Sequence, residues 1–155
     1  MRSYLGALAV VAVVSACAPS LPPTIAPPPA RDVFIHQPPP KVWDAALVLL
    51  TDLSIPIENM DRASWFLRTQ EMTLSNPAAS VDCGSRMPGQ AWTSVATVLV
   101  RYTMLLRPEG DSTGVRIQVS SRFAGGDGAG ECVSRGNLEG TLVDRLRARI
   151  ELGHS

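Results

Sequence analysis

A proline-rich stretch near the N-terminus most limits what this chain can fold into. Between Ala18 and Asp32 the sequence reads APSLPPTIAPPPARD, which contains six prolines. Proline has no backbone N–H, so this stretch can form neither a helix interior nor a central strand, and it favours extended polyproline geometry. The folded part of the chain therefore has to come from residues 33–155, a length that suits one domain with a modest core.

The segment that precedes the prolines has the features of a secretion signal. Arg2 is followed by an apolar run, and small residues stand directly before Cys17. This pattern is typical of an exported protein. The apolar run from Leu5 to Ala16 is shorter than the roughly 20 residues that a transmembrane helix needs. Two alternatives to the lipoprotein signal described next are a plain secretory signal cleaved after Ala16 and a single membrane anchor.

The four residues Val14-Ser15-Ala16-Cys17 resemble the lipobox of bacterial lipoproteins. In that family the peptide before the cysteine is removed, and the cysteine becomes an N-terminus that carries a diacylglycerol and a further acyl chain such as palmitate. The resemblance implies that residues 1–16 are a signal peptide and that Cys17 is the lipidation site. Two or three acyl chains on one residue would hold the protein on the membrane permanently.

Residues 17–32 are then expected to be a tether between the membrane and the domain. At about 3.1 Å per residue in polyproline geometry, the tether could reach roughly 45 Å from the bilayer. The alternative is a proline-rich peptide that binds an aromatic groove. Because Ala18 and not an aspartate follows the cysteine, resemblance to enterobacterial lipoproteins implies the periplasmic face of the outer membrane, with the inner membrane as the alternative.

The other two cysteines, Cys83 and Cys132, are predicted to form one disulfide, because disulfides persist in the oxidising compartments that exported proteins reach. This bond would close a loop of roughly 50 residues, for which the chain-entropy relation gives about 4 kcal/mol. Bonded cysteines cannot act as thiolate ligands or nucleophiles.

Charge and residue content argue against several classes of function. Without residues 1–16, which hold one of the 14 basic residues, the chain carries 14 acidic residues and a net charge of −1, and Lys41 is its one lysine. A nucleic acid partner is not expected, since that requires clustered basic residues. His36 and His154 are the two histidines. We therefore expect no catalytic residues, no metal site and no cofactor.

Hydrophobic periodicity over residues 33–155 switches between the periods of strands and helices. The expected elements are a strand over Val33–His36, a helix over Lys41–Leu53, a strand over Trp65–Gln70, a hairpin over Val95–Arg122 and a closing helix capped by Asn137. This order predicts an α+β fold in which an antiparallel sheet has two helices packed on one face.

Two resemblances bear on this domain. Val42–Thr69, with Asp61-Arg62-Ala63-Ser64-Trp65 before the strand, resembles the opening of the helix-grip domains of the BamC family of lipoproteins. The resemblance implies a helix, a turn and then the first strand of an antiparallel sheet. Asp82-Cys83-Gly84 and the segment Cys132–Glu139 resemble small uncharacterised proteobacterial lipoproteins. That resemblance supports the disulfide and implies no activity.

An anchor, a spacer and a compact domain suffice for a noncatalytic interaction or structural module of the cell envelope, with an envelope protein as partner. Trp92 follows the loop Met87–Ala91, and exposed loop aromatics are enriched at interfaces, so Trp92 is the candidate contact residue. One alternative is a binder of a small apolar or peptidic ligand between helix and sheet. An enzyme is the other alternative, and it would depend on His36 or Glu131.

Overall fold

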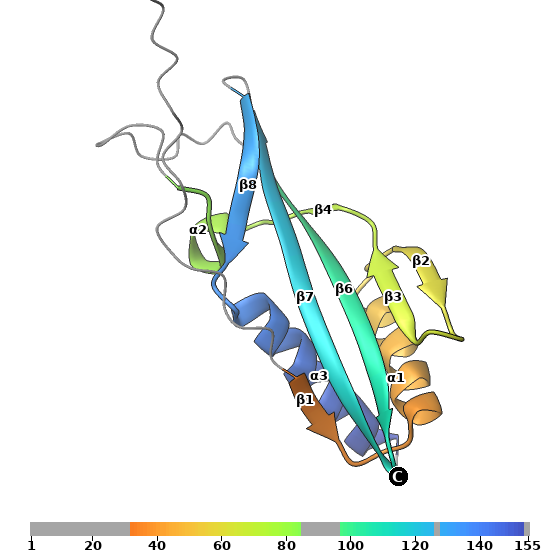
Figure 1. The fold of residues 1–155 in the computed structure, drawn as a ribbon. Coiled ribbons are helices and arrows are strands. Elements are labelled where there is room, and N and C mark those ends of the chain that lie inside the picture. The colour runs from red at the N-terminus through yellow and green to blue at the C-terminus, as the bar shows by residue number, and fades with distance from the viewer. Residues whose placement is uncertain (1–31, 85–96, 126–127, 154–155) are drawn as a thin grey trace, which may run out of the picture.

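The computed structural model describes residues 32–84, 97–125 and 128–153 (Figure 1). The predicted α+β architecture is confirmed: an antiparallel sheet forms one layer and helices form the other. The elements in chain order are β1 (Asp32–Ile35), α1 (Pro39–Asp52), β2 (Ile57–Asp61), β3 (Phe66–Thr69), β4 (Met72–Thr73), α2 (Pro77–Ser80), β5 (Val81–Asp82), β6 (Thr97–Glu109), β7 (Ser112–Gly125), β8 (Gly128–Ser134) and α3 (Asn137–Leu152).

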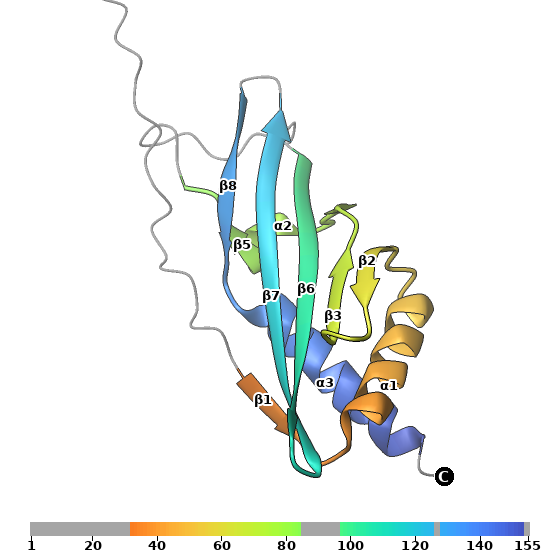
Figure 2. The ribbon, with the colours of Figure 1, turned by 45° about the vertical axis from the view of Figure 1, so that its right-hand side comes forward.

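A long hairpin made of β6 and β7 is the centre of the sheet (Figure 2). The pairing runs without interruption from Thr97 opposite Ala124 to Glu109 opposite Ser112. Gly110 begins the turn with a φ of 61°, a conformation that glycine adopts at no steric cost. The predicted hairpin is therefore correct, and its first strand continues to Glu109.

Shorter strands extend the sheet on both sides of the hairpin. On one side β3 and β4 pair with β6 in succession, and β2 pairs with β3; on the other side β1 and β8 pair with opposite ends of β7. Thr69, the last residue of β3, is fully buried where the pairing with β6 is interrupted before β4. Its hydroxyl accepts a 3.0 Å hydrogen bond from the Tyr102 N–H and donates one to the Gln70 carbonyl. A side chain thus replaces one backbone bond of the ladder.

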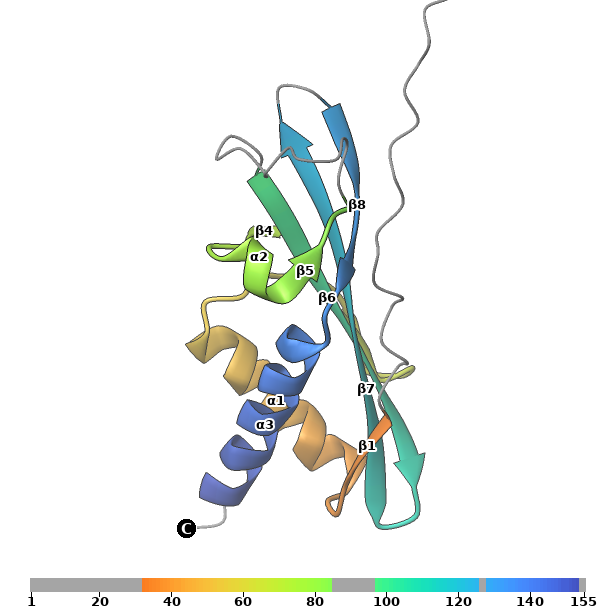
Figure 3. The same ribbon diagram turned by 90° about the vertical axis from the view of Figure 1, so that its left-hand side faces the viewer.

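The helices that the structure describes lie on the same side of the sheet (Figure 3). Pro39 and Pro40 occupy the first turn of α1, where a missing N–H costs nothing. The main core lies between α1, α3 and the sheet. Its fully buried side chains, all less than 2% exposed, include Val42, Ala46, Leu50, Leu67, Val115 and Leu146.

The predicted cap of the closing helix is wrong. Gly136 is the N-cap residue, with a φ of 88°, and Asn137 is the first residue of α3. The Asn137 side chain donates a 3.0 Å hydrogen bond to the Ala79 carbonyl of α2 instead. The Asn137 side chain therefore contacts α2 and does not cap α3. The hydrophobic periodicity did not predict α2, which has four residues.

A second, smaller core lies at the other end of the hairpin. Its buried residues are Val81, Val98, Phe123 and Cys132, and Leu74, Cys83 and Leu138 pack against them. Gly130 lets the Phe123 ring approach the backbone of β8 closely, since a β-carbon at this glycine would lie 2.5 Å from the Phe123 Cε1 atom.

Gly130→Ala is expected to lower the free energy of unfolding by about 1–3 kcal/mol, because the Phe123 ring would have to move in a packed core. Gly140→Ala is the matched comparison, because Gly140 is inside α3 and its added β-carbon would meet nothing within 4 Å. It should stabilise the domain by roughly 0.5–1 kcal/mol through helix propensity. Urea unfolding measures both values, and equal stabilities for the two variants would contradict the packing argument.

Candidate functional site

The cysteines of the domain are bonded to each other. Cys83 follows β5 and Cys132 is on β8, and a disulfide joins them. Cys17 and Trp92, the predicted lipidation site and contact residue, lie outside the described residues. Within the described ranges, no set of three or more histidine, cysteine, aspartate or glutamate side chains is placed to hold a metal ion. None of the described helices is long and apolar enough to cross a membrane.

The two residues on which an enzyme would depend are far apart. His36 Nδ1 lies 3.2 Å from the Ser112 hydroxyl at the start of β7, and Glu131 is paired with Arg122 near the end of that strand. Ten residues of a strand span about 33 Å. His36 and Glu131 therefore do not form one site.

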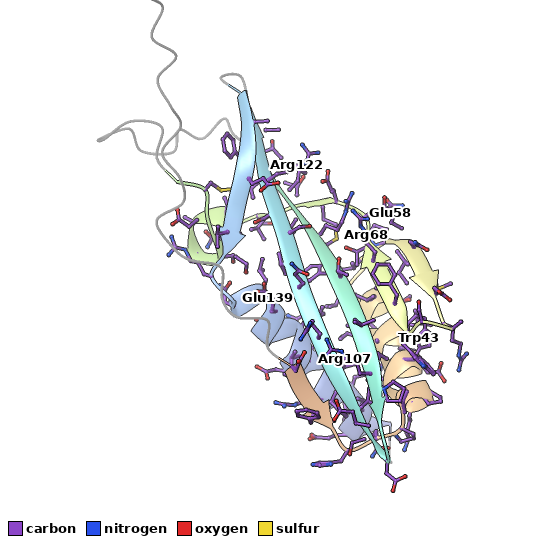
Figure 4. The ribbon with its side chains drawn as sticks, in the orientation of Figure 1. Trp43, Glu58, Arg68, Arg107, Arg122 and Glu139 are labelled. Carbon is purple, nitrogen blue, oxygen red and sulfur yellow. A yellow bond between two sulfur atoms is a disulfide. The ribbon has the colours of Figure 1, made fainter. Side chains whose placement is uncertain are left out.

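The most distinctive surface is the face of the sheet that the helices leave uncovered, here called the open face. Even-numbered residues of β6 such as Met104 and odd-numbered residues of β7 such as Val115 are buried against the helices. Because side chains alternate along a strand, the odd-numbered residues of β6 and the even-numbered residues of β7 point the other way. The open face carries the side chains of Arg68, Arg101, Arg107, Arg116 and Arg122. Figure 4 labels Arg68, Arg107 and Arg122 among them.

The charges on the open face have a definite arrangement. Four of its arginines are on the two central strands, and Arg68 is on the adjacent strand β3. Carboxylates surround them: Asp32 on β1, Glu58 on β2, Glu71 before β4, Glu131 on β8 and Glu109 beside the hairpin turn. The open face is thus basic at its centre and acidic at its rim.

Two arginines form bidentate ion pairs with rim carboxylates. Arg116 donates from Nε and Nη2 to the two Asp32 oxygens, both at 2.8 Å. Arg122 donates in the same way to Glu71, with Nε 2.9 Å from Oε1. The hydrogen bonds from Arg116 lower the pKa of Asp32, and those from Arg122 lower the pKa of Glu71. Such two-point contacts fix the orientation of both side chains.

The other three arginines contact the rim more loosely. Arg68 Nε and Arg101 Nε each lie 3.5 Å from Glu58 Oε2, and Arg107 Nη1 lies 3.5 Å from Asp32 Oδ2. These distances exceed the usual range of N–H···O hydrogen bonds. Arg101 Nε is buried and has no hydrogen-bond partner among the described residues, and the Arg101 side chain is 23% exposed.

Glu71→Gln is expected to weaken the dependence of stability on acid pH. The folded-state pKa values of Glu71 and Asp32 lie below their ordinary values of 4.5 and 3.8. The contribution of these two carboxylates to the free energy of unfolding is therefore complete above about pH 4.5, the ordinary pKa of a glutamate. This contribution is lost as the pH falls through the folded-state pKa values. Urea unfolding between pH 7 and pH 3 measures this loss. Glu71→Gln and Asp32→Asn should each reduce it, and a wild-type pH profile in both variants would contradict the assignment.

The sequence interpretation missed the open face, although a signal was present. Arg101 and Arg107 in one strand, and Arg116 and Arg122 in the next, have the same spacing of six residues. An even spacing keeps both members of a pair on one face of a strand. Sequence comparison gives no relative that would assign a role to this surface: no protein-family model matches the chain, and no curated protein matches it.

Proposed function

We propose that this protein is a lipid-anchored module of the bacterial envelope that binds another envelope protein without catalysing a reaction. The disulfide is the observation that carries the proposal. A stable disulfide is characteristic of exported proteins. Because Cys83 and Cys132 are bonded to each other, Cys17 is the remaining cysteine of the chain, and it directly follows the apolar segment that resembles a signal peptide.

The open face is our candidate for the contact surface. It carries five arginines and five carboxylates, and two bidentate ion pairs hold part of it in a fixed geometry. A surface of this kind favours recognition of a partner by charge and shape. The predicted contact at Trp92 stays a prediction, and so does the predicted binding of a small ligand between helix and sheet.

Cys17→Ser tests the anchor. If Cys17 carries the lipid, this variant should lose its attachment to the outer membrane and retain its signal peptide, whereas the wild-type protein should fractionate with the outer membrane. Mass spectrometry of the N-terminal peptide should show the acyl chains on the wild-type protein alone.

The double variant Cys83→Ser/Cys132→Ser is the matched control, because it replaces the two disulfide-bonded cysteines and leaves the lipobox intact. This control should remain acylated and attached to the membrane. A Cys17→Ser chain that kept wild-type fractionation and mass would exclude the lipid anchor.

A further inference from the structure

Three arginines of the open face have hydrogen-bonding capacity that the described part of the domain does not use. A guanidinium group carries five N–H donors. Arg68, Arg101 and Arg107 contact carboxylates only at 3.5 Å or more, and Arg101 Nε is buried without a hydrogen bond among the described residues. The side chains of Arg68 and Arg107 are each 43% exposed, so an added acceptor can reach their remaining N–H donors.

The unused donors lie at two levels of the same surface. Arg68 is paired across strands with Thr103, and Arg101 precedes Thr103 by two residues on the same face of β6. Arg107 lies six residues from Arg101 on that strand, a separation of about 20 Å. The open-face residues of β6 between them are the uncharged Thr103 and Leu105. Along β6 the pattern is two basic positions separated by two uncharged open-face residues, and Arg68 and Arg116 flank this interval on the neighbouring strands.

We propose that the open face binds an extended segment of a partner protein that carries acidic residues at two positions about six residues apart. This inference names the kind of partner for the surface in our proposed function and so depends on it. An extended segment has the same rise per residue as β6, so its two acidic positions would reach Arg101 and Arg107 together. A guanidinium group recognises a carboxylate strongly and with a defined geometry.

The acidic rim favours a narrow ligand over a broad one. A segment lying along β6 and β7 would contact the central arginines between Glu58 on one side and Glu131 on the other, and it would compete with Glu71 for Arg101 and Arg122. A flat anionic surface such as a phospholipid bilayer would bring its charges close to this rim and be repelled. The charge pattern thus favours a peptide segment over the membrane.

A designed peptide tests the proposal directly. The probe is a fluorescein-labelled Glu-Glu-Ser-Thr-Ser-Thr-Glu-Glu peptide, titrated with the full-length protein in a neutral detergent at low salt. Arg101→Gln and Arg107→Gln should each weaken binding by about threefold, the scale of an exposed ion pair. Glu58→Gln should strengthen binding by about twofold, because it removes a carboxylate that competes for Arg68 and Arg101.

The control variant is Arg145→Gln, which removes an exposed arginine from α3. It should bind the peptide as the wild-type protein does. A second peptide of the same composition, with its four glutamates adjacent, should bind more weakly than the first. Equal binding of the two peptides, equal loss in Arg145→Gln and Arg101→Gln, or no binding of the spaced peptide at millimolar concentration would each overturn the proposal.

Two further results distinguish the peptide proposal from binding of lipid headgroups and from the lipid-anchor proposal. If vesicles containing phosphatidylglycerol displace the peptide and Arg101→Gln abolishes vesicle binding, the surface recognises lipid headgroups and the peptide proposal is wrong. Failure of the lipid-anchor test would show in the fractionation of Cys17→Ser and would leave the peptide titration unchanged. The two proposals can therefore fail independently.

Discussion

Replacing both Cys83 and Cys132 with serine is expected to lower the free energy of unfolding by about 4 kcal/mol. The bond joins residues that are 49 positions apart in the chain, and without it the unfolded chain regains the entropy of that loop. Small domains have a total stability of about 5–15 kcal/mol. The double variant should therefore have a much lower urea midpoint than the wild-type protein.

Urea unfolding followed by tryptophan fluorescence or circular dichroism measures this change. Cys17→Ser is the control, because it removes the cysteine that lies outside the domain, and its midpoint should not move. Titration of thiols in the denatured, unreduced wild-type protein should find neither Cys83 nor Cys132 reactive. Two reactive thiols, or a double variant as stable as the wild-type protein, would show that the bond does not form.

Leu146→Ala is expected to lower the free energy of unfolding by about 3 kcal/mol, within the 2–5 kcal/mol range for a large-to-small change in a core. The Leu146 side chain is fully buried and belongs to the core between α1, α3 and the sheet. Truncation removes apolar contacts and leaves a cavity that its neighbours can only partly fill.

Leu152→Ala makes the same chemical change six residues later in α3, where the side chain is 71% exposed. This control should stay within about 0.5 kcal/mol of the wild-type protein. The two variants together separate core packing from helix propensity, because both replace leucine with alanine in one helix. Similar losses in the two variants would mean that α3 does not pack as the structure shows.

Elements with a long, regular hydrophobic pattern could be predicted from the sequence. The apolar face of α1 and the alternation in β6 and β7 each extend over many residues, so the correct period is clear. In α3 the spacing of Leu138, Leu142, Leu146 and Ile150 at every fourth residue predicts the buried face. The last three are buried, and Leu138 is partly buried against the smaller core. The order of these elements was enough to predict the α+β class.

Features that depend on contacts distant in sequence could not be predicted. Strands β4 and β5 have two residues each, too few to show a period. The pairing of Asp32 with Arg116 joins residues 84 positions apart. No local pattern brings such residues together, because the register of β1 against β7 decides which side chains meet.

The turn before β3 shows how tertiary packing can override local preference. Trp65 has a φ of 55°, a backbone conformation that bulky residues rarely adopt. Its ring packs edge-to-face against Trp43 of α1, with centroids 5.8 Å apart, and this contact offsets the cost of the backbone conformation. The sequence pattern predicts a strand from Trp65 to Gln70, but β3 begins at Phe66 and Trp65 belongs to the turn before it. The ring contact could not be predicted, because it depends on where α1 lies.

Two separate cores on one hairpin mean that this molecule can open at one end while the other end stays folded. The smaller core has few apolar side chains and depends on the disulfide between Cys83 and Cys132. Regions with few buried contacts open at a lower free energy than the whole protein does. Amide hydrogens near Val98 should then exchange with solvent faster than those near Met104, although both belong to the same strand. Reduction of the disulfide should widen that difference and turn one cooperative unit into two.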